Sequence, residues 1–555
     1  MNPVLKAHAS RKGGGKPVAA LAAGFAMLAA SVLAVPHGFA DTAPTNPNDP
    51  KTPVTVSADA LPTVQIDGVV WSQTIIGNTV YAVGKFSTAR PAGAAPGSQT
   101  VPRQNILAYS LTTGALISSF APTLNAQGLT ITTSPDKTRL YVGGDFTSVS
   151  GQIRNRVVAL NPTTGAVLSG FAPKVNGSVR AVVASEDTVW VGGLFTTVGT
   201  VARNRLAAFR SPDGFMLAWN PNASGGRVNA LTASPDYKRV VAGGAFTTLN
   251  GSSNPGYGLA ATDAVSGSII ATPVNDVVRN AGDGAAITSL STDGTNWYGT
   301  AYDFAGTGLL EGSFSANWSN LGLKWLEDCH GDSYSIFASN TAAYVAGHPH
   351  YCGNLGGFPE TNPRTWHRAV AFSKAATRTL TADTQGYKSF TGQPAPELLT
   401  WFPDMDTGTA TGQNQGPWHV TGNSQYILMG GEFKTVNFKG QQGLVRYAVS
   451  SLAPNKEGPR SSLDATNPVL SSPAKGQIKV RWQSNWDRDN SNLTYQVYRD
   501  GVVVNTQAKA TTFWNRPTLE YVDTVASGSA HSYRIGVKDP FGNAKSSTTV
   551  SLTAK

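Results

Sequence analysis

The chain has 555 residues, enough for two or three domains, and a formal net charge of +10. Charged residues make up only 14% of it and 59 residues are glycine, while helical periodicity is almost absent; this favours an all-β protein over a helical one. The lysines and arginines form no block, which argues against a nucleic-acid partner and leaves a weak attraction to an acidic polymer of the cell envelope.

The first 40 residues predict a secretory signal peptide. Four basic residues (Lys6, Arg11, Lys12 and Lys16) precede an apolar run at 17–35, and the small residues Gly38 and Ala40 offer cleavage after Ala40. Removing residues 1–40 lowers the net charge to +6 and places the mature protein outside the cell or at its envelope. A retained membrane anchor is the alternative. No later run approaches the roughly 18 apolar residues of a spanning helix, so we expect no membrane span after cleavage.

Residues 41–53, rich in proline, asparagine and threonine, are predicted to be a disordered leader. A short phrase then recurs along the chain. It reads YVGGDFT at 141–147, has close copies at 191–196, 242–247 and 429–434, a looser copy at 82–87, and degenerate copies at 298–302 and 345–349. The phrase therefore occurs seven times in all.

Each repeat holds four short runs of β-type residues separated by turn signals. A lone four-stranded sheet cannot bury both of its faces, but sheets repeated every ~50 residues can stack face to face and close into a ring. The pattern predicts a seven-bladed β-propeller over residues 54–449. The paired glycines end the second strand, where a side chain would crowd a neighbour, and the aromatic residue after them is predicted to be a core residue between blades.

The phrase GG-x-F-T followed by G-x-x-R-N-R-x-x-A, seen from Gly143 to Ala159 and from Gly192 to Ala207, resembles the delta-sixty repeat family. The resemblance extends from Val69 to Val449 and implies a β-propeller, but no particular activity. The seventh repeat lacks an outermost strand. We expect residues 54–66 to supply it and close the ring; a fold-back of the segment after Tyr447 is the alternative.

Residues 450–466 contain two prolines and a glycine and are predicted to be a linker. Residues 467–555 form a separate unit with the pattern of a seven-stranded sandwich, with Tyr533 in a packing role. The segments YVDT at 521–524, YRI at 533–535 and DPFGN at 539–543 resemble a fibronectin type III domain. In exported bacterial proteins this resemblance implies a spacer or accessory module beside polysaccharide-active units.

Histidine is concentrated in one part of the repeats. In a four-stranded antiparallel blade, the starts of strands one and three and the ends of strands two and four share one rim. The histidines of repeats six and seven all fall at such positions, so we expect them on one face near the central channel. They are His330, His348, His350, His367 and His419.

The two cysteines, Cys329 and Cys352, fall on that rim of the sixth repeat and are predicted to form a disulfide, as exported pairs usually do. The bond would join the long connection at 351–365 to the inner strand. Closing a loop of this size is worth about 3 kcal/mol of stability by chain entropy.

Three interpretations of this face compete. The first is a cleft that binds a glycan or peptide, with Tyr351, Trp366 and Trp418 as stacking platforms and Arg368 as a polar partner. The second is a centre for one divalent metal ion, held by His330, His348, His350 and Asp332. Catalysis, with or without a metal, would use one of the five histidines or Asp332 as an acid or base. The third is purely structural: the histidines satisfy backbone groups.

We predict an exported, monomeric protein that binds a cell-envelope or environmental polymer, above all a polysaccharide, at its histidine-rich face. An enzyme that cleaves such a polymer, a glycosidase or a polysaccharide lyase, is the first alternative. A structural envelope protein without a small ligand is the second.

Overall fold

The computed structural model describes residues 42–304, 306, 308–461 and 466–555. The predicted signal peptide lies outside these residues. Within them the protein is all-β, as predicted: strands are joined by turns, and the helical segments are two short 3-10 turns, η1 (Pro273–Asp276) and η2 (Gly353–Leu355). No helix in this described part has the length and apolar character needed to cross a membrane.

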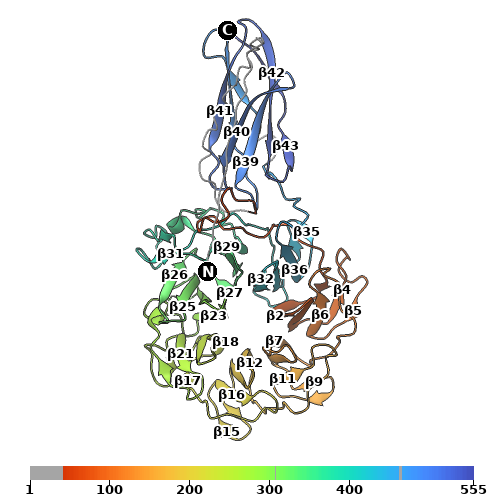
Figure 1. Ribbon diagram of the computed structural model, residues 1–555, viewed down its shortest axis with the longest axis vertical. Helices are drawn as coiled ribbons and strands as arrows, with labels where there is room; N and C mark the ends of the chain where they lie inside the picture. The colour runs from red at the N-terminus through yellow and green to blue at the C-terminus, as the bar shows by residue number, and fades with distance from the viewer. Residues whose placement is uncertain (1–41, 305, 307, 462–465) are drawn as a thin grey trace, which may run out of the picture. The chain divides into compact units, whose positions relative to one another are not determined.

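Between residues 69 and 448 seven larger antiparallel sheets, each with three or four strands, follow one another along the described chain, with short ladders beside them (Figure 1). The first three sheets are β2 (Val69–Ile76), β3 (Thr79–Lys85) and β6 (Ile106–Ser110); β7 (Gly128–Thr133), β8 (Leu140–Gly144) and β11 (Val157–Leu160); and β12 (Val179–Ala184), β13 (Thr188–Gly193) and β16 (Leu206–Arg210).

The fourth and fifth sheets are β18 (Val228–Ala233), β19 (Arg239–Gly244), β21 (Leu259–Asp263) and β22 (Ile269–Ile270), and β23 (Ala285–Thr292), β24 (Asn296–Asp303), β25 (Gly312–Asn317) and β26 (Leu323–Glu327). The sixth and seventh are β27 (Ser333–Ala338), β28 (Ala342–Gly347) and β29 (Ala369–Ser373), and β32 (Pro417–Gly422), β33 (Tyr426–Gly431) and β36 (Leu444–Ala448).

The first strands of these sheets surround a common axis (Figure 1). Each packs against the first strand of the next sheet, from β2 through β7, β12, β18, β23 and β27 to β32, and β32 in turn packs against β2. These seven larger sheets therefore close into a ring that brings residues from distant parts of the chain to its centre.

The double glycine of the repeated phrase is required by close packing. A Cβ atom on Gly192 would lie 2.5 Å from a methyl carbon of Val228 in the next sheet. One on Gly193 would lie 1.9 Å from the carbonyl oxygen of Ser178, in its own sheet. The phenylalanine that follows is fully buried, as Phe195 is, which confirms its predicted role in the core.

The segment predicted to close the ring does so. Ser57 N–H donates to the carbonyl of Ala448 at 2.9 Å, and Leu61 N–H donates to the carbonyl of Arg446 at 2.9 Å. Residues before the first sheet thus add the outer edge to the last sheet. The chain then runs through β1 (Gln65–Ile66), which pairs with β4 (Thr88–Arg90) beside the first sheet.

The structure differs from the sequence prediction in part of the supposed disordered leader. Thr42 is buried, and its N–H donates to the carbonyl of Asp489 at 2.8 Å. Asn492 Nδ2 donates to Thr45 Oγ1 at 3.3 Å. Thr42 and Thr45 therefore make defined contacts with the C-terminal residues Asp489 and Asn492, which the polar composition of the segment did not indicate.

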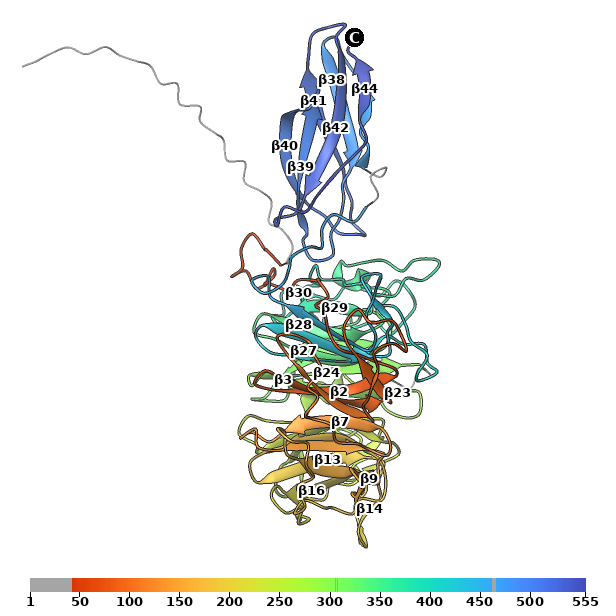
Figure 2. The same ribbon diagram turned by 90° about the vertical axis from the view of Figure 1, so that its right-hand side faces the viewer.

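The C-terminal residues form two further antiparallel sheets around one core, with Trp482 and Tyr533 at its centre (Figure 2). Tyr533 is buried, as predicted, and its hydroxyl donates to Asp523 Oδ2 at 2.8 Å. One sheet holds β37 (Val469–Ser471), β38 (Gln477–Gln483) and β41 (Thr518–Thr524); the other holds β39 (Asn492–Arg499), β40 (Val502–Ala510), β42 (Ala530–Lys538), β43 (Ala544–Ser546) and β44 (Val550–Thr553).

Candidate functional site

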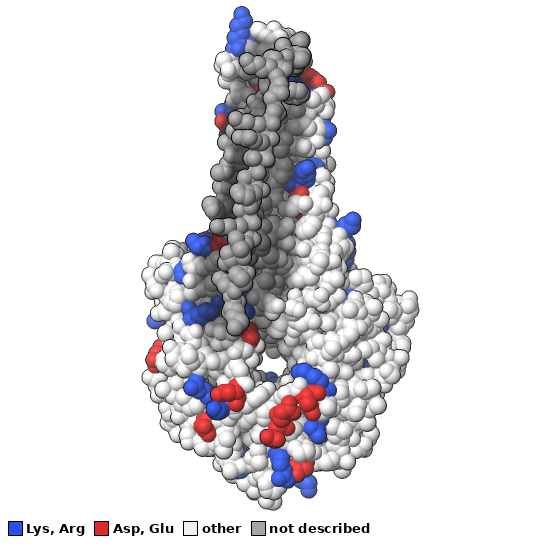
Figure 3. All heavy atoms as spheres, in the orientation of Figure 1, with Lys and Arg blue, Asp and Glu red and all other residues white. Residues whose placement is uncertain are grey.

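A cavity of about 820 Å³ lies at the centre of the ring, lined by residues of all seven first strands. Figure 3 shows the ring hollowed at its centre, with acidic and basic side chains near the opening. The volume of the cavity falls within the range of about 300–1,000 Å³ that is usual for ligand pockets.

A β-bulge aims one residue of every sheet into this cavity. In each first strand the pairing with the second strand skips one residue near the start of the strand. A bulge bends its strand and redirects the extra side chain, and such bulges are common beside functional sites. The seven bulge residues all line the cavity; they are Trp71, Leu129, Arg180, Asn229, Thr288, Tyr334 and Trp418.

The bulge residues divide the cavity wall into an aromatic and a polar part. Tyr334, Trp418 and Trp71 come from three consecutive sheets, the sixth, seventh and first. Their rings touch in series, with centroids 4.2 Å apart for Tyr334 and Trp418 and 5.2 Å apart for Trp418 and Trp71. We call these three residues the aromatic wall. The third, fourth and fifth sheets supply arginine, asparagine and threonine instead.

Hydrogen bonds hold the indoles of the aromatic wall in place. Trp71 Nε1 donates to Gln127 Oε1 at 2.9 Å, and Trp418 Nε1 donates to Glu432 Oε1 at 3.2 Å. Because both indole N–H groups already donate to protein side chains, the indole atoms that remain for a ligand are apolar.

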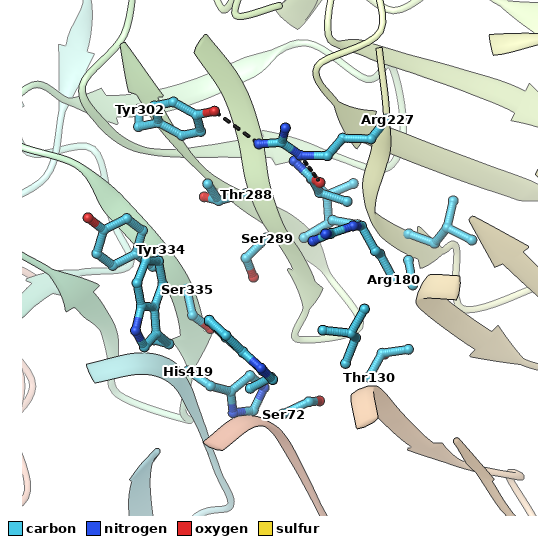
Figure 4. A pocket seen from close by; sticks show the side chains of 18 of the residues that line it. Ser72, Thr130, Arg180, Arg227, Thr288, Ser289, Tyr302, Tyr334, Ser335 and His419 are labelled. Atoms are coloured by element: carbon cyan, nitrogen blue, oxygen red, sulfur yellow. Dashed lines mark hydrogen bonds between the residues drawn. The ribbon is translucent and has the colours of Figure 1, made fainter. Parts of the chain in front are cut away.

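The polar part of the wall contains two arginines from adjacent sheets, Arg180 in β12 and Arg227 just before β18 (Figure 4). Arg227 Nε donates to Asn229 Oδ1 at 3.0 Å, and its Nη2 donates to the hydroxyl of Tyr302 at 3.1 Å. Arg180 has a buried Nε without a hydrogen-bond partner in the described part of the chain. Burial lowers the pKa of Arg180, and the nearby charge of Arg227 lowers it further.

His419 also lines the cavity, as Figure 4 shows, and has a buried Nδ1 without a partner among the described residues. Burial lowers its pKa to about 4, so the imidazole is neutral at pH 7. His419 and Trp418 are the predicted site residues of the seventh sheet that reach the central cavity.

His348 contacts Asp332, Tyr334 and Gln415, which line the cavity, and this hydrogen-bond network determines its protonation. The N–H of Asp332 donates to His348 Nε2 at 3.2 Å, and His348 Nδ1 lies 2.9 Å from Gln415 Oε1, which can only accept. The ring is therefore neutral, with its proton on Nδ1. Burial lowers the pKa of His348 and raises that of Asp332, whose carboxylate accepts from the hydroxyl of Tyr334 at 3.1 Å.

His330 and His350 lie further out, and each is paired with a carboxylate. His330 Nε2 is 2.6 Å from Asp383 Oδ2, and His350 Nδ1 is 2.6 Å from Glu360 Oε2. Burial lowers the pKa of both imidazoles, that of His350 to about 4. The ring of Tyr387 stacks on His330 with centroids 4.1 Å apart.

Trp366 connects these inner and outer histidines. Its ring lies 5.0 Å from that of His348 and 5.1 Å from that of His350, both edge to face. It is 38% exposed, and the guanidinium of Arg364 lies 5.4 Å above it. Tyr334 contacts His348 with ring centroids 5.7 Å apart. The aromatic wall therefore continues through His348 to an exposed tryptophan.

Three of the predicted site residues are placed differently from the expectation. His367 packs between Phe358 and Phe513, with centroids 4.3 and 4.6 Å away, and so belongs to an aromatic cluster that includes a C-terminal residue. Tyr351 is only 4% exposed and stacks on His330, so it offers no open platform. Arg368 donates to the carbonyl of Met405 at 3.3 Å. The five histidines therefore do not converge on one point.

The disulfide between Cys329 and Cys352 is present, as predicted. It fixes the start of the long connection beside His330 and His350. Nearby, Glu311 and Glu327 are largely buried, and burial raises the pKa of each to about 7. Asp328 Oδ2 is buried and lies 3.9 Å from His330 Nε2.

Within the described residues, no group of three or more histidine, cysteine, aspartate or glutamate side chains is placed to hold a metal ion. The residues of the predicted metal set belong to separate networks: His348 bonds with Asp332 and Gln415, whereas His330 and His350 each bond to their own acid. The metal hypothesis gains no support from this geometry.

The histidine pattern of the sequence does not point to the ring of bulge residues. A signal exists. When the first strands of the repeats are aligned, this one column varies from tryptophan to leucine, arginine, asparagine, threonine and tyrosine, while its neighbours remain largely small or aliphatic. Such a column indicates positions that do not pack in the core.

No protein-family model and no curated protein matches the chain. Among solved structures it is similar to the computationally designed Ika8 protein, at 12% identity and a TM-score of 0.36, over 87% of this chain and 98% of that one. It is also similar to a chain of the mitotic checkpoint complex, at 12% identity and a TM-score of 0.41, over 71% of this chain and 95% of that one. Similarities this weak carry no argument about function.

Proposed function

We propose that residues 54–449 are a seven-bladed β-propeller of the delta-sixty repeat type and that residues 467–555 are a fibronectin type III domain. The cyclic packing of the first strands and the closing segment support the first assignment. The two sheets around Trp482 and Tyr533 support the second. The boundaries 41–53 and 450–466 then separate a leader and a linker from these domains.

We propose further that the protein binds a polysaccharide in its central cavity, outside the cell or at its envelope, as a monomer. The observation that carries this proposal is the division of the cavity wall into aromatic and polar halves. Sugar rings present apolar C–H faces that pack on indole and phenol rings, and hydroxyl groups that need hydrogen-bond partners. Tyr334, Trp418 and Trp71 supply the first surface, and Asn229 and Thr288 belong to the second.

The continuation of the aromatic wall favours a polymer over a small ligand. Contacts run from Trp418 through Tyr334 and His348 to Trp366, which is exposed. A chain of sugars that enters the cavity can therefore remain in contact with aromatic rings as it leaves.

Calorimetric titration with oligosaccharides of defined composition tests this proposal. We expect binding by the wild type and a large loss of affinity in a Trp71→Ala/Trp418→Ala variant. Phe215→Ala, which removes an exposed ring outside the cavity, is the matched control and should bind normally. Equal binding by the double variant would contradict the proposed site. Absence of binding by the wild type would favour a structural envelope protein.

An acid–base enzyme acting on the same polymer is the second candidate function. It is favoured by the Glu360–His350 pair, in which the acid orients a neutral imidazole whose Nε2 makes no hydrogen bond within the described residues. A glycosidase or a lyase could use such a base. Release of products from polysaccharides by the wild type, lost in His350→Gln but binding retained, would establish this activity. Equal product release by the two proteins would remove His350 from consideration.

A further inference from the structure

Two arginines face the central cavity without an acidic partner. In the described part of the chain, neither Arg180 nor Arg227 has a carboxylate within ion-pair distance, and Arg227 bonds only to the neutral groups of Asn229 and Tyr302. Most other arginines of the ring donate to carbonyls or carboxylates, as Arg205 does to Ala223. Arg180 is half-buried, yet none of its nitrogens has a hydrogen-bond partner among these residues.

The acidic side chain whose charge acts on Arg180 is already engaged. Asp145 accepts from Gln127 Nε2 at 2.7 Å through one oxygen and from the hydroxyl of Ser178 through the other. It attracts Arg180 only through space. Asp283 and Asp332 also line the cavity, and Asp332 bonds to Tyr334 in the sixth sheet. The cavity therefore retains cationic groups that are not neutralised by direct contacts.

We propose that Arg180 and Arg227 bind a carboxylate group of the polymer, so that the ligand is an acidic polysaccharide built from uronic acids. This inference rests on the proposed function for its polymeric part. A guanidinium group offers paired N–H donors that match the two oxygens of a carboxylate, and such pairs are strongest where water is excluded. The arginines point into the cavity from β12 and from the residue before β18, on adjacent sheets (Figure 4).

The position of the arginines fits this ligand. They lie on the third and fourth sheets, while the aromatic wall comes from the sixth, seventh and first. A sugar ring packed on the wall can then direct its acidic substituent across the cavity toward the arginines. A neutral sugar would leave the two like charges facing each other with no counter-charge from the ligand.

A role of Arg180 in ligand binding and a role in stabilising the fold predict different effects of its replacement on the melting temperature. A half-buried cation without a partner costs folding free energy, so an arginine retained for the fold should have a partner. We therefore expect Arg180→Gln to keep or raise the melting temperature while it weakens binding. A fall in melting temperature together with unchanged binding would overturn the proposal.

The binding experiment uses oligogalacturonate and a neutral oligoglucan of equal length, titrated calorimetrically into the full mature chain. We expect the acidic oligomer to bind the wild type about tenfold more tightly or better, the difference that one charge-assisted hydrogen bond supplies. Arg180→Gln should abolish this preference. Arg210→Gln changes the same charge at an exposed arginine paired with Asp213 and should preserve it. Equal affinity for both oligomers would overturn the acidic-ligand inference and leave the proposed function intact.

If neither oligomer binds, a second experiment separates the proposed polysaccharide ligand from the proposed carboxylate site at the arginines. Free D-glucuronate and inorganic sulfate are then titrated into the wild type and Arg180→Gln. Glucuronate binding that the variant loses would support the arginine site and count against a polysaccharide ligand. Sulfate binding without glucuronate binding, or no binding of either, would overturn the carboxylate site.

Discussion

The ring centroids of the Trp418 and Trp71 indoles lie 5.2 Å apart, and this contact joins the seventh sheet to the first. Both are bulge residues, so their side chains are not part of the regular packing between the strands of a sheet. The backbone hydrogen bonds on either side of a bulge do not depend on the side chain of the bulge residue. The ring of sheets can therefore carry different residues at this position at little cost to the fold.

Trp418→Ala should therefore separate binding from stability. We expect the affinity for an oligosaccharide ligand to fall about tenfold, since a stacked aromatic ring contributes about 1 kcal/mol beyond its buried area. The midpoint of urea unfolding should change little. Tryptophan fluorescence follows both quantities. A variant that binds normally but unfolds at much lower urea would show that Trp418 serves the fold.

Closure of the ring depends on Arg446, which is buried and donates to the carbonyl of Pro62 at 2.6 Å and to Thr63 Oγ1 at 3.2 Å. It also donates to the carbonyl of Leu111, the residue after β6 of the first sheet. We expect Arg446→Met to lower the free energy of unfolding by about 3 kcal/mol, because buried carbonyls lose a charged donor. Calorimetry of the mature chain measures this, with Arg210→Met as the exposed control. Equal melting temperatures of the two variants would refute a closing role.

The disulfide between Cys329 and Cys352 also contributes to the free energy of unfolding, because it restricts the unfolded chain. Its cysteines are 23 residues apart, and the chain-entropy relation gives about 3 kcal/mol for a loop of that size. We expect a Cys329→Ser/Cys352→Ser variant to unfold at lower denaturant concentration and reductant to have the same effect on the wild type. Reductant should leave the variant unchanged. Destabilisation of both proteins by reductant would point to a different cause.

Much of the ring could be predicted from the sequence because its signals are local. The spacing of the double glycines reflects close approach of strands, as at Gly192 and Gly193, and the missing last strand required a supplier elsewhere. The disulfide was predicted because an exported pair of cysteines usually forms one, and the repeat places both on the same rim. The glycine spacing depends on the repeat itself, so one copy explains the others.

The site was harder to predict because it depends on departures from the repeat. Side chains of a strand alternate between its two faces, and a bulge shifts this alternation by one residue. The bulge at Arg180 therefore decides whether this side chain faces the core or the cavity. The alternation of apolar and polar residues in the sequence does not reveal the bulge. The segment that carries Asp383 and Tyr387 has no counterpart in other repeats, yet it covers His330. His367 has a rim position, but the side chain turns to Phe513, far along the chain.

Glu327 should make the protein less stable as pH rises. Burial raises its pKa to about 7 in the folded state, whereas an unfolded glutamate has a pKa of about 4.3. Between these values the native state binds a proton that the unfolded chain releases, so stability falls as pH increases through this window. We expect Glu327→Gln to gain up to about 3 kcal/mol relative to the wild type between pH 4 and pH 8. Unfolding curves at both pH values measure the gain, and a constant difference would contradict it.

His367 should have the opposite dependence. Burial lowers its pKa to about 4, and an unfolded histidine has a pKa of about 6.5. Between these values the unfolded chain binds a proton that the native state does not, so stability falls as pH decreases from 6.5 toward 4. His367→Phe keeps an aromatic ring between Phe358 and Phe513 and removes the titration. We expect the variant to gain about 2 kcal/mol over the wild type at pH 5 relative to pH 7.5. If the two proteins lose stability in parallel as the solution is acidified, His367 is protonated without penalty and the aromatic cluster is open to water.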